Sequence, residues 1–242
     1  MKVLVVIDNV FQYDRLVSLV GKRHLPGVEF DFRHSAVESA IWKHPDFHGK
    51  NKMIDVARDA DMIIEKYKLV ISVHCFQFFP AKLVSQIRCI NVHPGYNPIN
   101  RGWYPQVFAI VYGLPIGATI HEMDEQLDHG PIIARKFVEK HTWDTSYSIY
   151  NRVLEAEIEL FESNIEAIIH GTYTRIAPEQ EGTVYRKKDF NALCQLDMNE
   201  QGSFRQFYDR LRALSHGEYR NAWFIDPETG KKIFVKIDIS EG

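Results

Sequence analysis

The apolar residues of this chain form short runs that alternate with stretches of helical spacing. The runs predict buried strands, and residues 29–34 alternate apolar and polar side chains as a half-buried strand does. The predicted strands span residues 2–8, 29–34, 69–73, 90–93, 116–121 and 132–139, and the predicted helices between them span 53–67, 80–86 and 106–112. This alternation predicts an α/β fold of the Rossmann-like class, with a mainly parallel sheet and right-handed crossovers.

The carboxyl-terminal third has a different pattern. A long helix is predicted that Asp144 or Thr145 caps and that Gly171 ends, and its apolar residues recur at helical spacing. The segment 177–199 is polar and broken by proline and glycine, which predicts a domain boundary near residue 178. We therefore expect a catalytic domain at residues 1–177 and a small region at 178–242 that contains a helix and a β-hairpin, the hairpin pairing 221–225 with 232–239.

Composition narrows the classes of function. The formal net charge of −3 argues against nucleic acid as a partner, because domains that bind it usually carry a basic surface. No apolar run reaches the roughly 18 to 20 residues of a membrane span, and the first run is too short for a signal peptide, so we expect a cytoplasmic protein without membrane contact. The three cysteines and the histidines lack the spacing of disulfide frameworks or metal sites, so no metal is expected.

A polar motif follows the strand at 90–93. Asn91 and His93 are two residues apart, so an extended strand turns both side chains to one face. Pro94 and Gly95 then break the strand at its carboxyl end, where open α/β sheets bind ligands. The motif predicts a site for an amide and an imidazole, while a strand that merely ends in polar residues remains the alternative reading.

Three motifs together resemble one enzyme family. The stretches 91–94 (Asn-Val-His-Pro), 98–102 (Pro-Ile-Asn-Arg-Gly) and 124–132 (Asp-Glu-Gln-Leu-Asp-His-Gly-Pro-Ile) are similar to those of the folate-dependent formyltransferases, which move a formyl group from 10-formyltetrahydrofolate to an amine. The resemblance implies a catalytic triad of Asn91, His93 and Asp128. The longer pattern 93–106 resembles the branch that formylates amino groups of nucleotide-linked deoxysugars.

These residue types suit formyl transfer. The reaction passes through a tetrahedral intermediate with a negative oxygen, and a donor such as the Asn91 amide stabilises that charge. The attacking amine must lose a proton, and His93 can accept it or, when protonated, donate to the oxygen. Both roles of His93 stay open from sequence. Asp128 is expected to hold His93 and to help relay the proton.

The resemblance also implies the binding residues. It places the pterin between Phe78 or Phe79 and Leu127, next to the loop that begins at Asp124; the chain lacks the glycines that some relatives have at the Phe78 loop. The expected acceptor is a dTDP-linked amino-4,6-dideoxy sugar, with a 3- or 4-amino group. Its expected contacts are Asn9, Gln77, Tyr96, Arg101, Tyr104, Tyr219 and Trp223, with a place in the hairpin core as the alternative for Trp223.

The assembly and the wider role are expectations of the same kind. One face of the second hairpin strand carries apolar residues, which predicts either packing on the helix at 204–214 or a homodimer through the hairpin; the resemblance favours the homodimer. The resemblance also implies a role in the synthesis of a surface polysaccharide such as the lipopolysaccharide O-antigen. The alternatives are a catalytically silent nucleotide-sugar or folate binding module, and a formyltransferase for another small amine. The apolar face comprises Ile233, Val235, Ile237 and Ile239.

Overall fold

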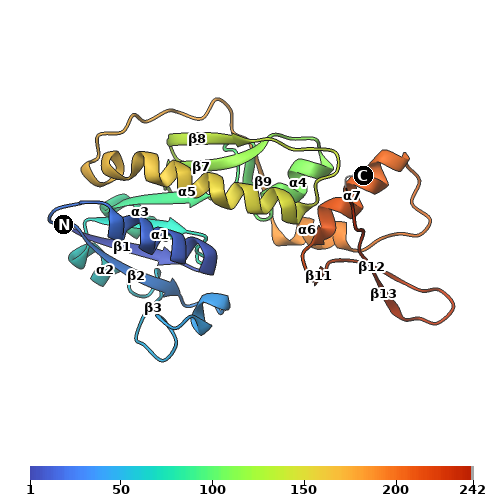
Figure 1. The fold of residues 1–242 in the computed structure, drawn as a ribbon, viewed down its shortest axis with the longest axis horizontal. Helices are drawn as coiled ribbons and strands as arrows, with labels where there is room; N and C mark the ends of the chain where they lie inside the picture. The colour runs from blue at the N-terminus through green and yellow to red at the C-terminus, as the bar shows by residue number, and fades with distance from the viewer. Residues whose placement is uncertain (241–242) are drawn as a thin grey trace.

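A seven-stranded sheet forms the centre of the computed structural model, which describes residues 1–240 (Figure 1). The strand order is β3-β2-β1-β4-β5-β7-β8; the pairs from β3 to β5 are parallel and the last two pairs are antiparallel. The Rossmann-like, mainly parallel fold expected from the sequence is thereby confirmed. The strands are β1 (Lys2–Ile7), β2 (Glu29–Ser35), β3 (Met53–Ile54), β4 (Leu69–Val73), β5 (Arg88–His93), β7 (Ile116–Glu122) and β8 (Ile132–Val138).

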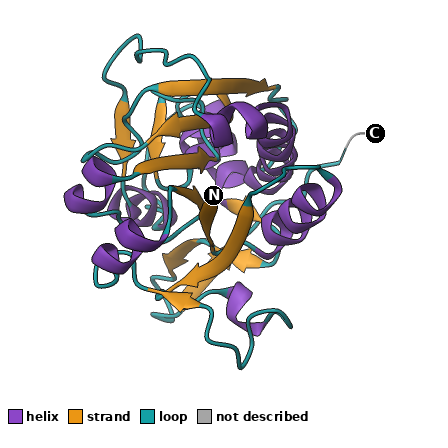
Figure 2. Ribbon diagram, turned by 90° about the vertical axis from the view of Figure 1, so that its left-hand side faces the viewer, coloured by secondary structure: helices purple, strands orange, loops and turns teal. Residues whose placement is uncertain are grey.

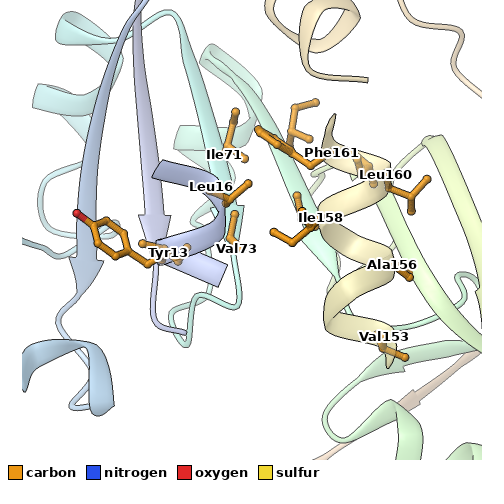
Figure 3. Close-up of a cluster of buried hydrophobic side chains, with 14 of the residues drawn as sticks. Tyr13, Leu16, Ile71, Val73, Val153, Ala156, Ile158, Leu160 and Phe161 are labelled. Carbon is orange, nitrogen blue, oxygen red and sulfur yellow. The ribbon is translucent and has the colours of Figure 1, made fainter. Parts of the chain in front are cut away.

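Helices cover both faces of the sheet, as the view turned by 90° shows (Figure 2). Successive residues of β1 point to opposite faces, and Val3 and Val5 join one buried cluster while Leu4 and Val6 join another. The first cluster lies under α1 (Val10–Lys22) and α5 (Ser146–His170), the second under α2 (Ala60–Lys66) and α3 (Ala81–Gln86). In Figure 3, Ile158 and Phe161 of α5 point toward the side chains of Leu16, Ile71 and Val73.

The helix predicted at 53–67 is only half correct. Met53 and Ile54 pair with His34 and Ser35 of β2, and the helix starts at Ala60. The turn between them is built by Asp55, whose side chain accepts hydrogen bonds from two amides of the following turn. Such a local bond offers the backbone an alternative to the helix, which apolar spacing alone does not reveal.

The carboxyl-terminal region folds more regularly than its polar sequence predicted. The strand β9 (Thr183–Tyr185) pairs in parallel with β6 (Asn100–Gly102) and so ties the segment beyond residue 178 to the first part of the chain. The hairpin strand predicted at 232–239 is shorter and ends at Val235; the backbone amide of Ile237 donates instead to Ser215 Oγ at 3.1 Å. The remaining elements are η1 (Ala40–Lys43), β6 (Asn100–Gly102), α4 (Pro105–Val111), β9 (Thr183–Tyr185), α6 (Lys187–Cys194), α7 (Phe204–Leu214), β10 (Ser215–His216), β11 (Tyr219–Arg220), β12 (Ala222–Ile225) and β13 (Lys232–Val235).

Among residues 1–240, no helix combines the length and the apolar character that crossing a membrane requires. The long helix α5 is amphipathic instead. Thr145 caps its start by accepting from the Ser148 amide, and Gly171 ends it in a left-handed conformation with φ of 69°. Its first turns lie at the carboxyl edge of the sheet, where they contribute to the cavity described next.

Candidate active site

A cavity of about 850 Å³ opens at the carboxyl ends of β1, β4 and β5. Its walls come from the loops after these strands, the loop after β7, the first turns of α5 and the segment around β10 and β11. Open α/β sheets bind ligands at this edge, and the volume lies within the range of about 300 to 1,000 Å³ that is usual for small-molecule sites.

The structure brings Asn91, His93 and Asp128 together in this cavity. Asn91 Nδ2 donates to Asp128 Oδ1 at 3.0 Å, and Asp128 Oδ2 lies 3.6 Å from His93 Nδ1. The second carboxylate oxygen also accepts from the Gly102 amide at 2.9 Å. Asp128 has a φ of 48°, a left-handed conformation that costs energy for a residue with a side chain and is typical of functional sites.

Hydrogen bonds determine the orientation of the two histidine rings. His93 Nε2 lies 2.9 Å from the Asn100 carbonyl, which can only accept, so Nε2 carries a hydrogen and Nδ1 faces Asp128. His121 Nδ1 lies 2.7 Å from the Glu122 carbonyl, so His121 Nε2 is left to accept from Asn91 Nδ2 at 3.3 Å. The Asn91 amide nitrogen is therefore directed at two acceptors. His121 belongs to none of the sequence motifs, and its register opposite Asn91 is a product of the fold.

The electrostatics keep Asp128 ionised. Burial raises the pKa of the Asp128 carboxyl group, but the charge of His93, the neighbouring ring of His121 and the Gly102 amide outweigh burial and lower this pKa well below its ordinary value of 3.8. The side chains of His93 and Asp128 are only 5% and 9% exposed, so solvent screens their interaction weakly. Asp128 is thus a carboxylate at neutral pH.

All four residues expected at the pterin contribute to the cavity wall, but in different ways. Phe78 is 57% exposed and presents its ring to the cavity, with Asp124 and Leu127 on the loop after β7. Phe79 is 2% exposed, because most of its ring packs in the core cluster with Leu83. Phe78 is therefore the more accessible of the two for stacking.

The residues expected at the acceptor divide into two groups. Asn9, Gln77, Tyr104 and Tyr219 contribute to the cavity wall, whereas Arg101, Tyr96 and Trp223 do not. The three exceptions have structural contacts that the sequence did not reveal, and substrate binding by these residues remains a prediction.

Arg101 is 2% exposed and donates to the Leu127 carbonyl at 2.9 Å and to Glu181, so it braces the loop that carries Asp128. Tyr96 lies beneath the Arg135 guanidinium. Trp223 sits in the hairpin with the Lys232 ammonium over its ring, as the alternative reading proposed.

The cavity wall includes residues that sequence reasoning missed. His74 follows β4 in a left-handed conformation with φ of 52°, and its ring contacts Tyr150 and Glu157 of α5. Because α5 follows the motifs by many residues, only the fold brings its side chains to the sheet edge. Further wall residues of this kind are Ser146, Tyr147, Asn151, His216 and Asn221.

Comparison with protein families agrees with this geometry. Residues 32–165 match the model described as formyl transferase, and residues 189–241 match the model described as N-formyltransferase dimerization C-terminal domain. The chain belongs to the formyl transferase family.

Sugar N-formyltransferases are among the similar proteins. The chain is 45% identical, over 98% of its length and 96% of the relative, to the dTDP-4-amino-4,6-dideoxyglucose formyltransferase of Mycobacterium tuberculosis. A crystal structure described as a likely sugar N-formyltransferase from this organism shares 44% identity with a TM-score of 0.90, and covers 100% of this chain and 98% of its own. The 4-N formyltransferase of Francisella tularensis has 38% identity and a TM-score of 0.92, covering 99% and 98%.

Proposed function

We propose that this protein transfers a formyl group from 10-formyltetrahydrofolate to the 4-amino group of dTDP-4-amino-4,6-dideoxyglucose. The observation that carries the proposal is the meeting of Asn91, His93 and Asp128 in one cavity large enough for parts of two ligands. The relative from Mycobacterium tuberculosis, similar over almost the whole chain, supports the choice of this amino sugar over its 3-amino isomer. The formyl donor is a substrate that each turnover consumes.

The neutral ring of His93 supplies a base. Its Nε2 hydrogen is held by the Asn100 carbonyl, so the lone pair on Nδ1 accepts a proton from the ammonium form of the acceptor. The freed amine then forms a bond to the formyl carbon, and the carbonyl electrons move to oxygen. Asp128, 3.6 Å from Nδ1, stabilises the imidazolium that results.

Asn91 acts on the negative oxygen. Asn91 Nδ2 has two contacts, and the one with His121, at 3.3 Å, is the longer. In the reaction the substrate oxygen replaces His121 as the acceptor of this hydrogen, while the 3.0 Å bond to Asp128 holds the amide in place. When the intermediate collapses, the bond between the formyl carbon and the folate nitrogen breaks. The proton held by His93 passes to that nitrogen, which restores the neutral ring. The sugar nitrogen loses its second proton to solvent, so the product is the neutral formamide.

The two ligands occupy different ends of the cavity. In this proposal the pterin stacks on Phe78 and lies along the loop of Asp124 and Leu127, and the buried side of Phe79 supports that loop. The sugar nucleotide extends from the catalytic residues past β4 toward the carboxyl end of β1. Its proposed contacts are Asn9, Gln77, Tyr104 and Tyr219.

The protein acts as a homodimer in this proposal. The matched family model is a dimerization domain, and the hairpin exposes large apolar side chains: Ile225, Ile233 and Phe234 are 49%, 38% and 43% exposed. Ile225 and Phe234 lie on one face of the hairpin and Ile233 on the other, and a second copy of the chain packed around the hairpin would bury them. The cytoplasmic location and the supply of a formamido sugar to a surface polysaccharide such as the lipopolysaccharide O-antigen remain predictions from the sequence.

Incubation with 10-formyltetrahydrofolate and a panel of acceptors tests the proposal. Mass spectrometry should detect a formyl adduct with dTDP-4-amino-4,6-dideoxyglucose, and a much slower one with the 3-amino isomer. Preference for the 3-amino isomer would reassign the acceptor. Binding of both ligands without any adduct would favour a silent binding module, and formylation of an unrelated amine would favour the other alternative.

A further inference from the structure

A chain of hydrogen bonds runs from the cavity wall into the core, beyond the residues that the proposed reaction uses. Asn9 Nδ2 contacts Tyr150 Oη at 3.2 Å, Tyr150 Oη contacts His74 Nδ1 at 3.4 Å, and His74 Nε2 contacts Glu157 Oε2 at 2.7 Å. Gln12 Nε2 also donates to Glu157 Oε2, at 2.7 Å. Asn9, His74 and Tyr150 contribute to the cavity wall, while Gln12 and Glu157 lie behind them.

The direction of several of these bonds is determined by their neighbours. Asn9 Oδ1 caps α1 by accepting from the Gln12 amide, so its Nδ2 end faces Tyr150 and can only donate. The Tyr150 oxygen therefore accepts from Asn9, and its own hydrogen is free for His74 Nδ1 or for a ligand in the cavity. Burial raises the pKa of Tyr150, so the hydroxyl keeps this hydrogen at neutral pH.

The burial of Glu157 destabilises the fold, which indicates a functional role for this side chain. Its side chain is fully buried, it has no arginine or lysine partner among residues 1–240, and its Oε1 atom lacks a hydrogen-bond partner there. Burying a carboxylate in this way disfavours folding, and an apolar residue would fill the same space without the cost. What Glu157 does is hold His74, and His74 is itself in a left-handed conformation.

The location suits a phosphate group. Ser72 of β4 lies opposite Asn91 in the sheet register, and β1 is the next strand beyond β4. The catalytic residues and Asn9 are thus about 10 Å apart, two strand spacings. The 4-amino group and the anomeric oxygen of a hexose are at opposite ends of the ring, so a phosphate begins about one sugar length from the reacting nitrogen.

Hydrogen-bond donors have to bind the phosphate in this cavity. In the described part of the chain, the cavity wall contains no lysine and no arginine. The helices α1 and α5, of 13 and 25 residues, both begin at this end, and their free amides favour an anion.

We propose that Tyr150 donates its hydroxyl hydrogen to a phosphate oxygen of the acceptor, and that Glu157 and His74 are positioning residues: Glu157 holds the His74 ring, which packs edge-on against the ring of Tyr150. The inference rests on the proposed function, because it assigns a residue to the diphosphate of that acceptor. Asn9 completes the frame by donating to the Tyr150 oxygen. Glu157 touches no ligand and acts only through His74.

The affinity for dTDP, measured by calorimetric titration, tests the assignment. A hydrogen bond to a charged oxygen is lost in Tyr150→Phe, so this variant should bind dTDP about 10- to 100-fold more weakly while its affinities for thymidine and for folinic acid stay within twofold of wild type. The matched control is Tyr112→Phe, because Tyr112 is exposed and does not contribute to the cavity wall. An equal loss of affinity in the control would overturn the specific role of Tyr150.

A double-mutant cycle tests the positioning role. Glu157→Gln keeps the shape of the side chain and should weaken dTDP binding about threefold or more, but the double variant with Tyr150→Phe should bind no more weakly than Tyr150→Phe alone. In turnover, Glu157→Gln should raise KM for the sugar nucleotide and leave kcat unchanged. If Glu157→Gln fails to fold, His74→Asn takes its place in the cycle.

Additive losses in this cycle would overturn the positioning role. Wild-type affinity for dTDP in Tyr150→Phe would overturn the phosphate contact while leaving formyl transfer by the wild type intact. A wild-type protein that neither binds dTDP nor formylates the amino sugar would instead remove the proposed function.

Discussion

Replacing Asp128 with asparagine should nearly abolish turnover while the fold survives. The change keeps the size of the side chain but removes the charge that lies 3.6 Å from His93 Nδ1. At the effective dielectric constant of about 20 that suits protein sites, this pair is worth about 4 to 5 kcal/mol. Loss of that stabilisation from the transition state slows transfer by about three powers of ten, since each 1.36 kcal/mol is tenfold.

The same substitution also disturbs the hydrogen bonds around Asp128. Its two oxygens accept from Asn91 Nδ2 and from the Gly102 amide, so the new amide group of Asp128→Asn must face one of these donors with a donor of its own. The unsatisfied group costs about 1 to 3 kcal/mol of stability.

Single-turnover transfer from labelled 10-formyltetrahydrofolate, stopped by rapid quenching, measures the effect directly. Glu125→Gln is the matched control, because Glu125 is an exposed carboxylate on the same loop. A transfer rate for Asp128→Asn within tenfold of wild type would refute the reasoning, provided that folinic acid still binds.

Three further predictions concern the cavity and the surface. Phe78→Ala should weaken folinic acid binding about tenfold by calorimetry with little loss of stability, whereas Phe79→Ala should lower the free energy of unfolding by about 3 to 5 kcal/mol in urea titrations. Burial lowers the pKa of His216, so as pH falls below 6.5 the unfolded chain takes up a proton that the folded chain does not. The contribution of His216 to stability is therefore fully present above pH 6.5 and is lost as the pH falls below it. We expect His216→Gln to show a smaller fall in Tm between pH 7.5 and pH 5.5. Replacing Ile233 and Phe234 with lysine should give a monomer in light scattering, and a monomeric wild type at micromolar concentration would reject the dimer.

The candidate catalytic residues could be identified from the sequence because each lies in a short local motif. Asn91 and His93 share a face by the alternation of a strand, and Asp128 belongs to a loop with its own pattern of residues. The strands β1, β4 and β5 could also be predicted from the sequence, since a strand covered on both faces is continuously apolar.

What the sequence could not predict depends on contacts between distant segments. Arg101 carries a charge suited to a diphosphate, yet it bonds to the Leu127 carbonyl and to Glu181, which approach it only in the folded chain. Glu157 follows the pattern of an ordinary helix, and its partner His74 lies 83 residues earlier in the sequence. Buried polar networks of this kind leave no periodic signal.

The most direct test of the central claim follows the formyl carbon itself. With 10-formyltetrahydrofolate labelled with ¹³C in the formyl group and dTDP-4-amino-4,6-dideoxyglucose as acceptor, NMR should show the label moving to a formamide on the sugar nitrogen. The wild type should complete this transfer, and His93→Ala should leave the label on the folate, because the acceptor ammonium then has no base. A wild type that leaves the label on the folate, or a His93→Ala variant that transfers it at the wild-type rate, would contradict the account.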